Sequence, residues 1–462
     1  MTVAPPTDAA LALIEFIDAS PSPYHAAETT AALLEAAGFR RGDPTSVAVA
    51  ATGGSVRGVS VTGGSVVAWS APRQVGPTTT FRLIGAHTDS PNLRIKPNPD
   101  VQRNGLAQLG VEVYGGVLLN SWLDRDLGLS GRVAVRGDGA PVLHLFRIDE
   151  PLLRIPQLAI HLDREINDKG LLLNKQQHLA PLWATVGEDG TATRFAEVVG
   201  EAVGAAAADV LAWDAMVHPL EPSRVVGLHR EFVSAPRIDN QLSCFAAASA
   251  LAAVAGSGDG GERAGGDGPD TVTVVVLFDH EEVGSTSDRG AAGGYLSSVL
   301  ERIWLAAGGD RAGYLRALAE GCCLSADCAH ATNPNYADRH EPEHRIALGG
   351  GPVLKVNANV RQRHRRRLGG AVGAGLRTGR GGPAALRQPH RSGLRVHDRS
   401  ADGGRAGHPH RRRGRGHSWR CTRPGLCAVA DVAAAPPWSS SSADPPPAAG
   451  RLKYGSGTYW LV

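Results

Sequence analysis

Six histidine and acidic side chains stand where an apolar stretch of this chain ends or a helical pattern begins. They are His87, Asp89, Asp239, Glu281, Glu282 and Asp327. An imidazole can bind zinc while a nearby carboxylate orients its ring. Two adjacent carboxylates at the end of a buried strand repel each other unless a cation compensates them. One carboxylate of such a pair can bind a metal ion while its neighbour transfers protons, so these residue types fit a two-zinc hydrolase site.

Each of these residues, considered alone, also has an ordinary explanation. His87 and Asp89 are of the polar type that ends many strands, and the acidic stretch at 279–285 has the composition of a solvated turn. Asp239 stands where an N-cap would precede a helix. Asp327 is ambiguous by itself. The metal site is favoured because residues so far apart in the sequence occupy the same kind of position.

The apolar patterns around these residues predict an α/β fold. Residues 8–39 alternate apolar and polar positions at helical spacing, and Gly38 ends the second of two expected helices. Residues 56–89 contain strand patterns, and 271–278 is an apolar run typical of a fully buried strand. Residues 236–255 are rich in Ala and predict a buried helix. These elements together indicate a mixed sheet flanked by helices on both faces.

The chain is long enough for more than one domain. Its 462 residues exceed what a single core usually organises. Short strand patterns over 95–220 predict an inserted β-rich domain. The catalytic domain is then discontinuous, with its two parts at 1–94 and 221–360. Within the second part, the Gly- and Asp-rich residues 256–269 predict a loop.

Five motifs, in order along the chain, closely resemble those of the aspartyl aminopeptidase family of zinc metallo-exopeptidases. The motifs are H-T-D-S-P-N-L-R-I-K-P, R-I-P-Q-L-A-I-H-L-D-R, R-I-D-N-Q-L-S-C, F-D-H-E-E-V-G-S and S-A-D-C-A-H-A-T-N-P-N-Y. The resemblance extends from about residue 8 to about residue 357. It implies an α/β zinc-peptidase domain whose inserted β domain builds a large homo-oligomer.

The resemblance also implies a role for each of the six residues. The implied zinc ligands are His87, Asp239, Glu282 and Asp327. Two zinc ions are expected in each subunit, and Asp239 would bridge them. Glu281 would be the general base that activates the shared water, and Asp89 would orient His87.

Three further residues are implied to contact the substrate, namely His161, His330 and Lys355. His161 would be either a metal ligand or a substrate contact, and the sequence leaves both roles open. Lys355 is suited to pair with an acidic first side chain. The implied activity is zinc-dependent removal of N-terminal residues, preferably Asp or Glu, from peptides. Another two-zinc amide hydrolase, such as a deacylase, is the alternative.

The charge of the chain is unevenly distributed. Residues 361–420 contain 17 Arg and no Lys, against two Asp and no Glu, so the rest of the chain is acidic although the net charge is +3. A basic segment of this kind could bind nucleic acid. It lacks Lys and has neither helical nor strand periodicity, and we therefore expect no nucleic-acid partner.

The composition is typical of a cytoplasmic protein without a membrane partner. No run of about 18 apolar residues occurs, and the N-terminal residues do not have the pattern of a signal peptide. Six cysteines in a chain of this length do not form a disulfide framework. We expect them to be buried free thiols.

The family pattern stops after Asn357. The family continues with R-Y-A-T-D, with a C-G-S-T-I-G-P loop, and with an M-H-S whose histidine completes the zinc site. None of these is present in the sequence. Residues 361–425 are instead dominated by Arg, Gly, His and Pro, which is the composition of a GC-rich gene translated in the wrong frame. Without the histidine, the printed chain is expected to be inactive or poorly folded.

Shifted reading frames restore the missing motifs. With suitable codons, Gln362–Arg366 and Leu394–Ala401 read one nucleotide later give N-A-T-D and C-G-S-T-I-G-P-L. Ser418–Arg423 read two nucleotides later gives L-A-M-H-S. Leu426–Val432 resembles the family in the printed frame again, and 436–462 has the Pro- and Ser-rich composition of a disordered tail. We therefore hypothesise several frame changes, caused by sequencing errors or by gene decay.

Resequencing of the gene tests this hypothesis. We expect the reading frame to depart from the printed one near codon 362 and to return before codon 426. A read that confirms the printed codons throughout would contradict the sequencing-error version and leave gene decay as the explanation.

Overall fold

The computed structural model describes residues 7–50, 55–256, 271–355, 386–387, 425–433 and 458–459. The helices are α1 (Asp8–Asp18), α2 (Pro23–Ala36), α3 (Pro44–Ala50), α4 (Ile166–Lys169), α5 (Phe195–Ala202), α6 (Ile238–Gly256), α7 (Tyr295–Ala306), α8 (Arg311–Glu320) and α10 (Val429–Ala433). The 3₁₀ turns are η1 (Leu119–Trp122), η2 (Ala207–Asp209), η3 (Glu281–Val283) and η4 (Pro334–Arg339).

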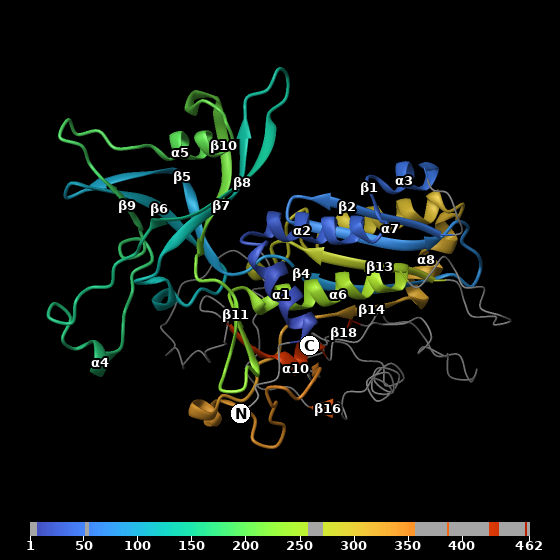
Figure 1. Cartoon of the computed structure of the whole chain (residues 1–462). Coiled ribbons are helices and arrows are strands. Elements are labelled where there is room, and N and C mark those ends of the chain that lie inside the picture. The colour runs from blue at the N-terminus through green and yellow to red at the C-terminus, as the bar shows by residue number, and fades with distance from the viewer. Residues whose placement is uncertain are drawn as a thin grey trace, which may run out of the picture.

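The strands of the described residues fall into four sheets, and two of these sheets dominate the two halves of Figure 1. The first ten strands along the chain are β1 (Arg40–Arg41), β2 (Ser55–Thr62), β3 (Ser65–Pro72), β4 (Thr80–His87), β5 (Asn92–Arg103), β6 (Leu106–Tyr114), β7 (Leu127–Val135), β8 (Val142–Leu153), β9 (Leu182–Thr185) and β10 (Val210–Pro219). The later strands are β11 (Arg224–Val226), β12 (Phe232–Ala235), β13 (Thr271–Phe278), β14 (Cys322–Ser325), β15 (Leu354–Lys355), β16 (Leu386–Arg387), β17 (Gly425–Ala428) and β18 (Thr458–Tyr459).

A mixed sheet forms the half that holds both the N-terminal segment and α6–α8. In the described residues its strand order is β1-β2-β3-β13-β4-β14-β18. The central strands β13, β4 and β14 are parallel to one another, whereas β3 is antiparallel to both of its neighbours, β2 and β13. The predicted strands at 56–89 and 271–278 are therefore confirmed.

Helices cover both faces of this sheet because its central strands are apolar on both sides. Alternate residues of β13 enter two cores, with Val272, Val274 and Val276 in one and Val275 and Leu277 in the other. The first core also contains side chains of α3, α7 and α8, and the second contains side chains of α1, α2 and α6. The predicted α/β class, with helices on both faces, is confirmed.

An antiparallel sheet forms the other half, which we call the inserted sheet. Its strand order is β8-β7-β10-β5-β6-β9, and it has its own apolar core. The chain enters this sheet at Asn92, five residues after β4 ends at His87, and leaves it at Pro219. The predicted β-rich character of this region is confirmed, and the domain boundaries at 95 and 220 stay a prediction.

The segment at 425–433 packs onto the half that contains the mixed sheet. Strand β17 pairs with β12, and the side chains of Cys427 and Val432 are buried in a core that also contains Leu13 and Ile17 of α1. The backbone amides of Gly349 and Gly351 both donate to the Asp431 carboxylate at 3.0 Å. A family-like segment after residue 425 thus has a place in the fold.

Two short pairings differ from the sequence prediction. Strand β16, at 386–387, pairs with β15 inside the segment predicted to be aberrant, and β18, at 458–459, pairs with β14 inside the predicted disordered tail. Backbone hydrogen bonds need no particular side chains, so an open strand edge accepts such pairs. The rest of 361–424 and of the tail, and the loop predicted at 256–269 except Gly256, lie outside the described residues.

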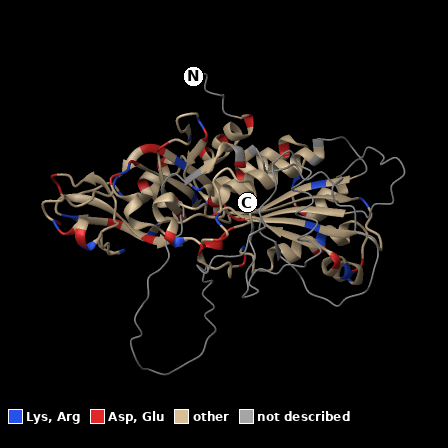
Figure 2. Ribbon diagram, turned by 90° about the horizontal axis from the view of Figure 1, so that it is seen from below, with Lys and Arg blue, Asp and Glu red and all other residues tan. Residues whose placement is uncertain are grey.

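Charges and thiols in the described residues follow simple patterns. Figure 2 shows acidic and basic residues interspersed over both halves. The described cysteines are free thiols, as predicted, but of these Cys244 and Cys427 alone are buried. None of the helices in the described ranges combines the length and the apolar character that a bilayer crossing requires.

A buried histidine lies in β10. The side chain of His218 is 4% exposed, and its ring nitrogens lie 3.1 Å from Ser130 Oγ and 3.1 Å from Asp149 Oδ1. Burial, together with the charge of Arg237, lowers the pKa of His218 from its usual 6.5 to about 3. His218 is therefore neutral in the folded protein at pH values where an unfolded chain would protonate it.

We expect His218 to destabilise the fold below about pH 6.5, because the unfolded state binds the proton and the folded state does not. The stability present above pH 6.5 falls by about 1.4 kcal/mol per pH unit for one such histidine, until the folded pKa near 3 is reached. Urea unfolding at pH 7, 6 and 5 measures this slope. His218→Gln should flatten it, whereas His229→Gln, at an exposed position, should not. Equal slopes for His218→Gln and the parent would contradict the assignment.

Candidate metal centre and active site

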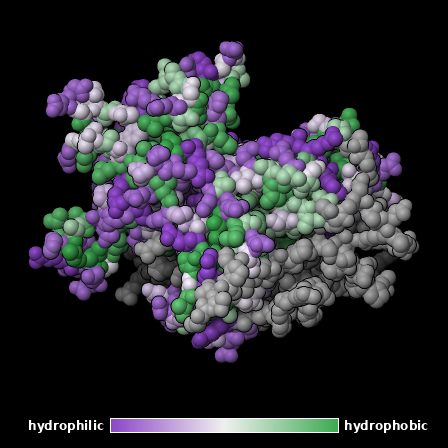
Figure 3. Space-filling model, viewed as in Figure 1, coloured by the Kyte–Doolittle hydropathy of each residue, from purple (hydrophilic) through white to green (hydrophobic). Residues whose placement is uncertain are grey.

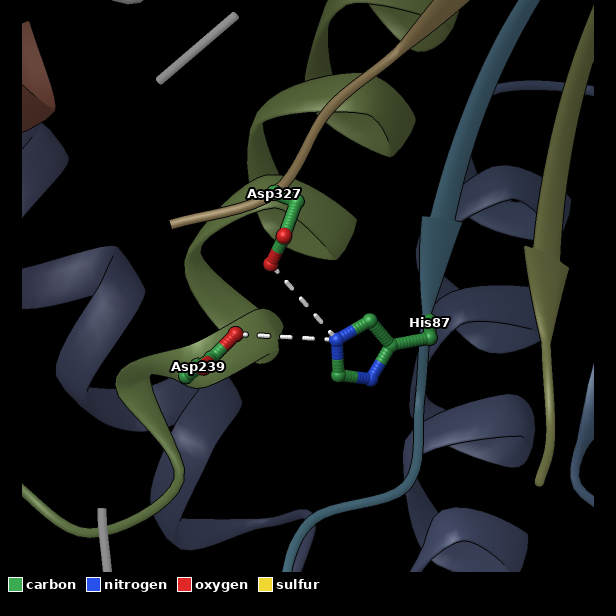
Figure 4. A group of neighbouring side chains, drawn as sticks. All are labelled: His87, Asp239 and Asp327. Carbon is green, nitrogen blue, oxygen red and sulfur yellow. Dashed lines mark ion pairs between the residues drawn. The ribbon is translucent and has the colours of Figure 1, made fainter. Parts of the chain in front are cut away.

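One group of three metal-ligating side chains gathers in the described part of the chain. It consists of His87, Asp239 and Asp327, whose ligand atoms all lie within 4.8 Å of one another. His87 Nε2 is 3.5 Å from Asp239 Oδ1 and 3.8 Å from Asp327 Oδ1. Figure 4 shows both carboxylates pointing at this nitrogen from different segments. This is the arrangement of a metal site with one nitrogen and two oxygen ligands.

The parallel strands bring these residues together. Strands β13, β4 and β14 run side by side, with Phe278 of β13 paired to His87 at the end of β4. The Ala326 amide, just after β14, donates to the carbonyl of Gly85 in β4. Because the carboxyl ends of parallel strands meet at one edge of a sheet, the residues that follow them share one site.

Asp239 is held at the start of α6 by hydrogen bonds from several segments. Its carbonyl accepts the Ser90 hydroxyl at 2.9 Å, and the side-chain amide of Asn240 donates to the Ala326 carbonyl at 2.8 Å. Arg237, at a left-handed φ of 56°, donates to the Ile17 carbonyl at 3.1 Å. The backbone at Asp239 is not helical. The local structure therefore aims this carboxylate at His87 and does not use it as an ordinary helix cap.

The residues present fit a bound cation. Asp239 Oδ1 is buried and has no hydrogen-bond partner in the described part of the chain. Burial alone would lower the pKa of His87, but the surrounding carboxylates of Asp239, Asp327 and Asp89 raise it well above its usual value. A buried site that favours positive charge so strongly, and that offers imidazole and carboxylate donors, suits zinc.

Asp89 contacts the imidazole ring of His87 through two groups. His87 Nδ1 lies 2.9 Å from the backbone carbonyl of Asp89 and 3.3 Å from its carboxylate Oδ1. A carbonyl can only accept, so Nδ1 carries the proton and Nε2 is left to face the ligands. The sequence predicted the orienting role for the carboxylate, and the structure shows that the backbone carbonyl makes the shorter contact.

Glu281 lies beside the cluster on the turn η3. Its Oε2 is 3.8 Å from His87 Nε2, and its side chain is 28% exposed. Burial raises the pKa of Glu281, and the charges of Asp327, Asp89 and Asp239 raise it further, against the opposing effect of His87. A carboxylate with a raised pKa, close to a metal site but open to solvent, has the properties of a general base.

Glu282 occupies the next position on the same turn. Its backbone amide donates to Asp89 Oδ2 at 3.1 Å, as that of Glu281 does to Oδ1 at 3.1 Å. The three-residue group of close ligand atoms does not include the Glu282 carboxylate. Its predicted role as a ligand of a second ion therefore stays a prediction.

The three predicted substrate contacts lie at different places. His161 is exposed on the segment between β8 and α4, and its side chain makes no hydrogen bond or ion pair with another described residue. His330 is half-buried, three residues after Asp327. Lys355 is the last residue of β15. His330 therefore follows the cluster residue Asp327 closely in the sequence, whereas His161 is exposed and is not among the three clustered residues.

Sequence reasoning missed Tyr114, which touches the site. Its hydroxyl donates to Asp89 Oδ2 at 2.6 Å. Tyr114 ends a strand pattern that was visible in the sequence, but its position opposite Asp89 depends on the pairing of β5 with β6. No local signal at Tyr114 could have indicated that contact.

Known proteins resemble the chain over most of its length. The family model described as "Aminopeptidase I zinc metalloprotease (M18)" matches residues 16–368. A protein of Streptomyces coelicolor named "Probable M18 family aminopeptidase 2" is 49% identical over 352 residues, which are 76% of this chain and 77% of that protein. The chain therefore belongs to the M18 family and is a metalloaminopeptidase, a hydrolase of peptide bonds.

Solved structures share the fold. The cryo-EM structure of the Ape4 and Nbr1 complex contains a chain with a TM-score of 0.75 and 28% identity, over 92% of this chain and 83% of that chain. The S. cerevisiae mApe1 dodecamer matches with a TM-score of 0.66 and 24% identity, over 83% of this chain and 85% of that chain. The second likeness concerns the fold alone. The resemblance to zinc aminopeptidases noted in the sequence is confirmed.

Removal of the Asp239 carboxylate tests the metal site. We expect Asp239→Asn to weaken zinc binding by more than about 100-fold, because loss of a direct ligand exceeds the 10–100-fold effect of outer-shell partners. Chelator-competition titration of the metal-free protein measures the affinity. Asp338→Asn, at a carboxylate 75% exposed, should bind zinc like the parent. Parental affinity in Asp239→Asn would contradict the site.

Proposed function

We propose that this chain derives from an enzyme that removes N-terminal Asp or Glu from peptides, with a zinc site built on His87, Asp239 and Asp327. The observation that carries the proposal is the gathering of these three residues at the strand ends with Glu281 beside them. When bound there, zinc supplies polarisation of the scissile carbonyl and makes a water molecule more acidic. The remaining steps belong to side chains of the chain itself.

Glu281 is the proton carrier in this proposal. Its carboxylate accepts a proton from the attacking water and delivers it to the leaving amine as the peptide bond breaks. Its position supports this role, because Oε2 lies 3.8 Å from His87 Nε2, on the rim of the cluster. Asp89 holds the backbone amide of Glu281 at 3.1 Å, which fixes the turn that carries the base.

The preference for an acidic residue rests on Lys355 in this proposal. A lysine ammonium pairs with the carboxylate of an N-terminal Asp or Glu side chain by a charge-assisted hydrogen bond. His330, three residues after the ligand Asp327, is the second proposed substrate contact. His161 keeps its two open roles, as a ligand or as a substrate contact.

A second zinc ion would be held by Asp239, which would be a ligand of both ions, and by Glu282. The histidine that completes this position in the family is missing from the printed sequence after Asn357. We therefore propose that the printed chain retains the site of His87, Asp239 and Asp327, and binds a second ion weakly. Activity would fall in proportion to the loss of that ion.

A homo-oligomer is the proposed assembly. Figure 3 shows apolar patches on the half of the molecule that contains the inserted sheet. Exposed apolar side chains there include Leu143, Leu158, Leu162 and Leu172, which are 57–84% exposed. Contiguous exposed apolar patches mark interaction surfaces in soluble proteins. The similar mApe1 structure is a dodecamer. The cytoplasmic location expected from the sequence stays a prediction.

A panel of aminoacyl anilides tests the proposed reaction. We expect the frame-corrected chain to bind two zinc ions and to hydrolyse aspartyl- and glutamyl-anilide faster than leucyl-anilide. The printed chain should bind about one ion and show little activity, because it lacks the closing histidine. Zinc content by mass spectrometry and anilide release by absorbance provide the two readouts.

Matched variants of the frame-corrected chain exclude a contaminating peptidase. Glu281→Gln should keep its zinc and lose about 10²- to 10⁴-fold in rate, while Glu320→Gln, at a side chain 55% exposed, should retain the parental rate. Strong zinc-dependent activity of the printed chain would contradict the requirement for the histidine. Preferential hydrolysis of N-acyl amino acids would instead indicate the deacylase.

A further inference from the structure

Tyr114 connects the inserted sheet to the metal site. It is the last residue of β6, and its hydroxyl donates to Asp89 Oδ2 at 2.6 Å. Asp89 lies between β4, which carries His87, and β5, which opens the inserted sheet. The register of β5 and β6 places Asn92 opposite Tyr114, so the sheet itself brings the phenol back to the site.

The Asp89 carboxylate is held from several sides. Oδ1 accepts the Glu281 amide at 3.1 Å and lies 3.3 Å from His87 Nδ1. Oδ2 accepts the Glu282 amide at 3.1 Å and the Tyr114 hydroxyl at 2.6 Å. The phenol therefore makes the shortest of these contacts. A rotation of the carboxylate away from Tyr114 would disturb both amides and the imidazole together.

Tyr114 is itself fixed in place. The guanidinium of Arg94 on β5 lies 4.2 Å from the centre of the Tyr114 ring, in a cation–π contact. The His280 ring, next to Glu281, lies 6.5 Å away on a tilted plane. Burial, and the charge of Asp89, raise the pKa of Tyr114, so the phenol stays protonated and acts as a hydrogen-bond donor.

We propose that Tyr114 is a positioning residue for the metal site, acting through Asp89 on the imidazole of His87 and on the turn that carries Glu281. The inserted sheet then has a role inside its own subunit, because it sets the geometry of the site beside it. This inference rests on the metal site of the proposed function. We therefore expect that removal of the Tyr114 hydroxyl, which belongs to the inserted sheet, changes how the half with the mixed sheet binds zinc.

The test compares Tyr114→Phe with Tyr295→Phe in the full chain. Tyr295, the first residue of α7, also donates through a half-buried hydroxyl, but its acceptor is the Ser60 carbonyl of β2, at 3.0 Å. Zinc affinity is measured by chelator competition, and the ligand geometry by the visible absorption of the cobalt-substituted protein. Urea unfolding of the metal-free variants separates positioning from stability.

We expect Tyr114→Phe to weaken zinc binding by about tenfold and to change the cobalt spectrum. Tyr295→Phe should alter neither, although it loses a comparable hydrogen bond. In an Asp89→Asn background the addition of Tyr114→Phe should cause little further loss, because the two residues act through one contact. Parental affinity and spectrum in a folded Tyr114→Phe would overturn the proposal.

Two other outcomes are also decisive. A parent chain that binds no zinc would contradict the metal site and, with it, this role of Tyr114. If Tyr114→Phe does not fold, 3-fluorotyrosine incorporated into the parent chain tests the same contact. The fluorine signal of Tyr114 should then shift on addition of zinc while that of Tyr295 does not, and an unchanged Tyr114 signal would contradict the coupling.

Discussion

The need of closely spaced, largely buried carboxylates for a cation governs the structure around His87. The Asp239 and Asp327 carboxylates converge on the imidazole nitrogen within 3.8 Å, and Asp239 Oδ1 is buried without a hydrogen-bond partner in the described residues. Like charges in a medium of low polarity repel strongly. A protonated imidazole relieves this only in part. A divalent cation with these residues as ligands satisfies the site, and the surrounding structure keeps it in shape.

The fold meets this need by bringing together segments that are far apart in the sequence. Parallel strands end at one edge of the mixed sheet, where the last residue of β4 is His87 and the segments that follow β13 and β14 supply Glu281 and Asp327. Backbone contacts fix the segments to one another, as at Ala326 with Gly85. The inserted sheet adds Tyr114, so both halves of the molecule contribute to one site.

Much of this could be predicted from sequence because the signals are local. Apolar runs such as 271–278 identify buried strands, and a polar residue at the end of such a run identifies a site at the sheet edge. The contact of Tyr114 with Asp89 depends on strand pairing and leaves no local trace. Asp239 has the sequence context of a helix cap, yet hydrogen bonds from distant segments turn it toward His87. The Arg-rich stretch at 361–425 follows neither helical nor strand periodicity, and nearly all of it lies outside the described residues.

Anomalous X-ray diffraction at the zinc absorption edge, on crystals of the full chain grown with zinc, shows whether these three side chains bind the metal. We expect a zinc peak within bonding distance, about 2.0–2.2 Å, of His87 Nε2 and of one carboxylate oxygen each from Asp239 and Asp327. A map with no peak among these three side chains, or with zinc bound at another site while they remain unliganded, would contradict it.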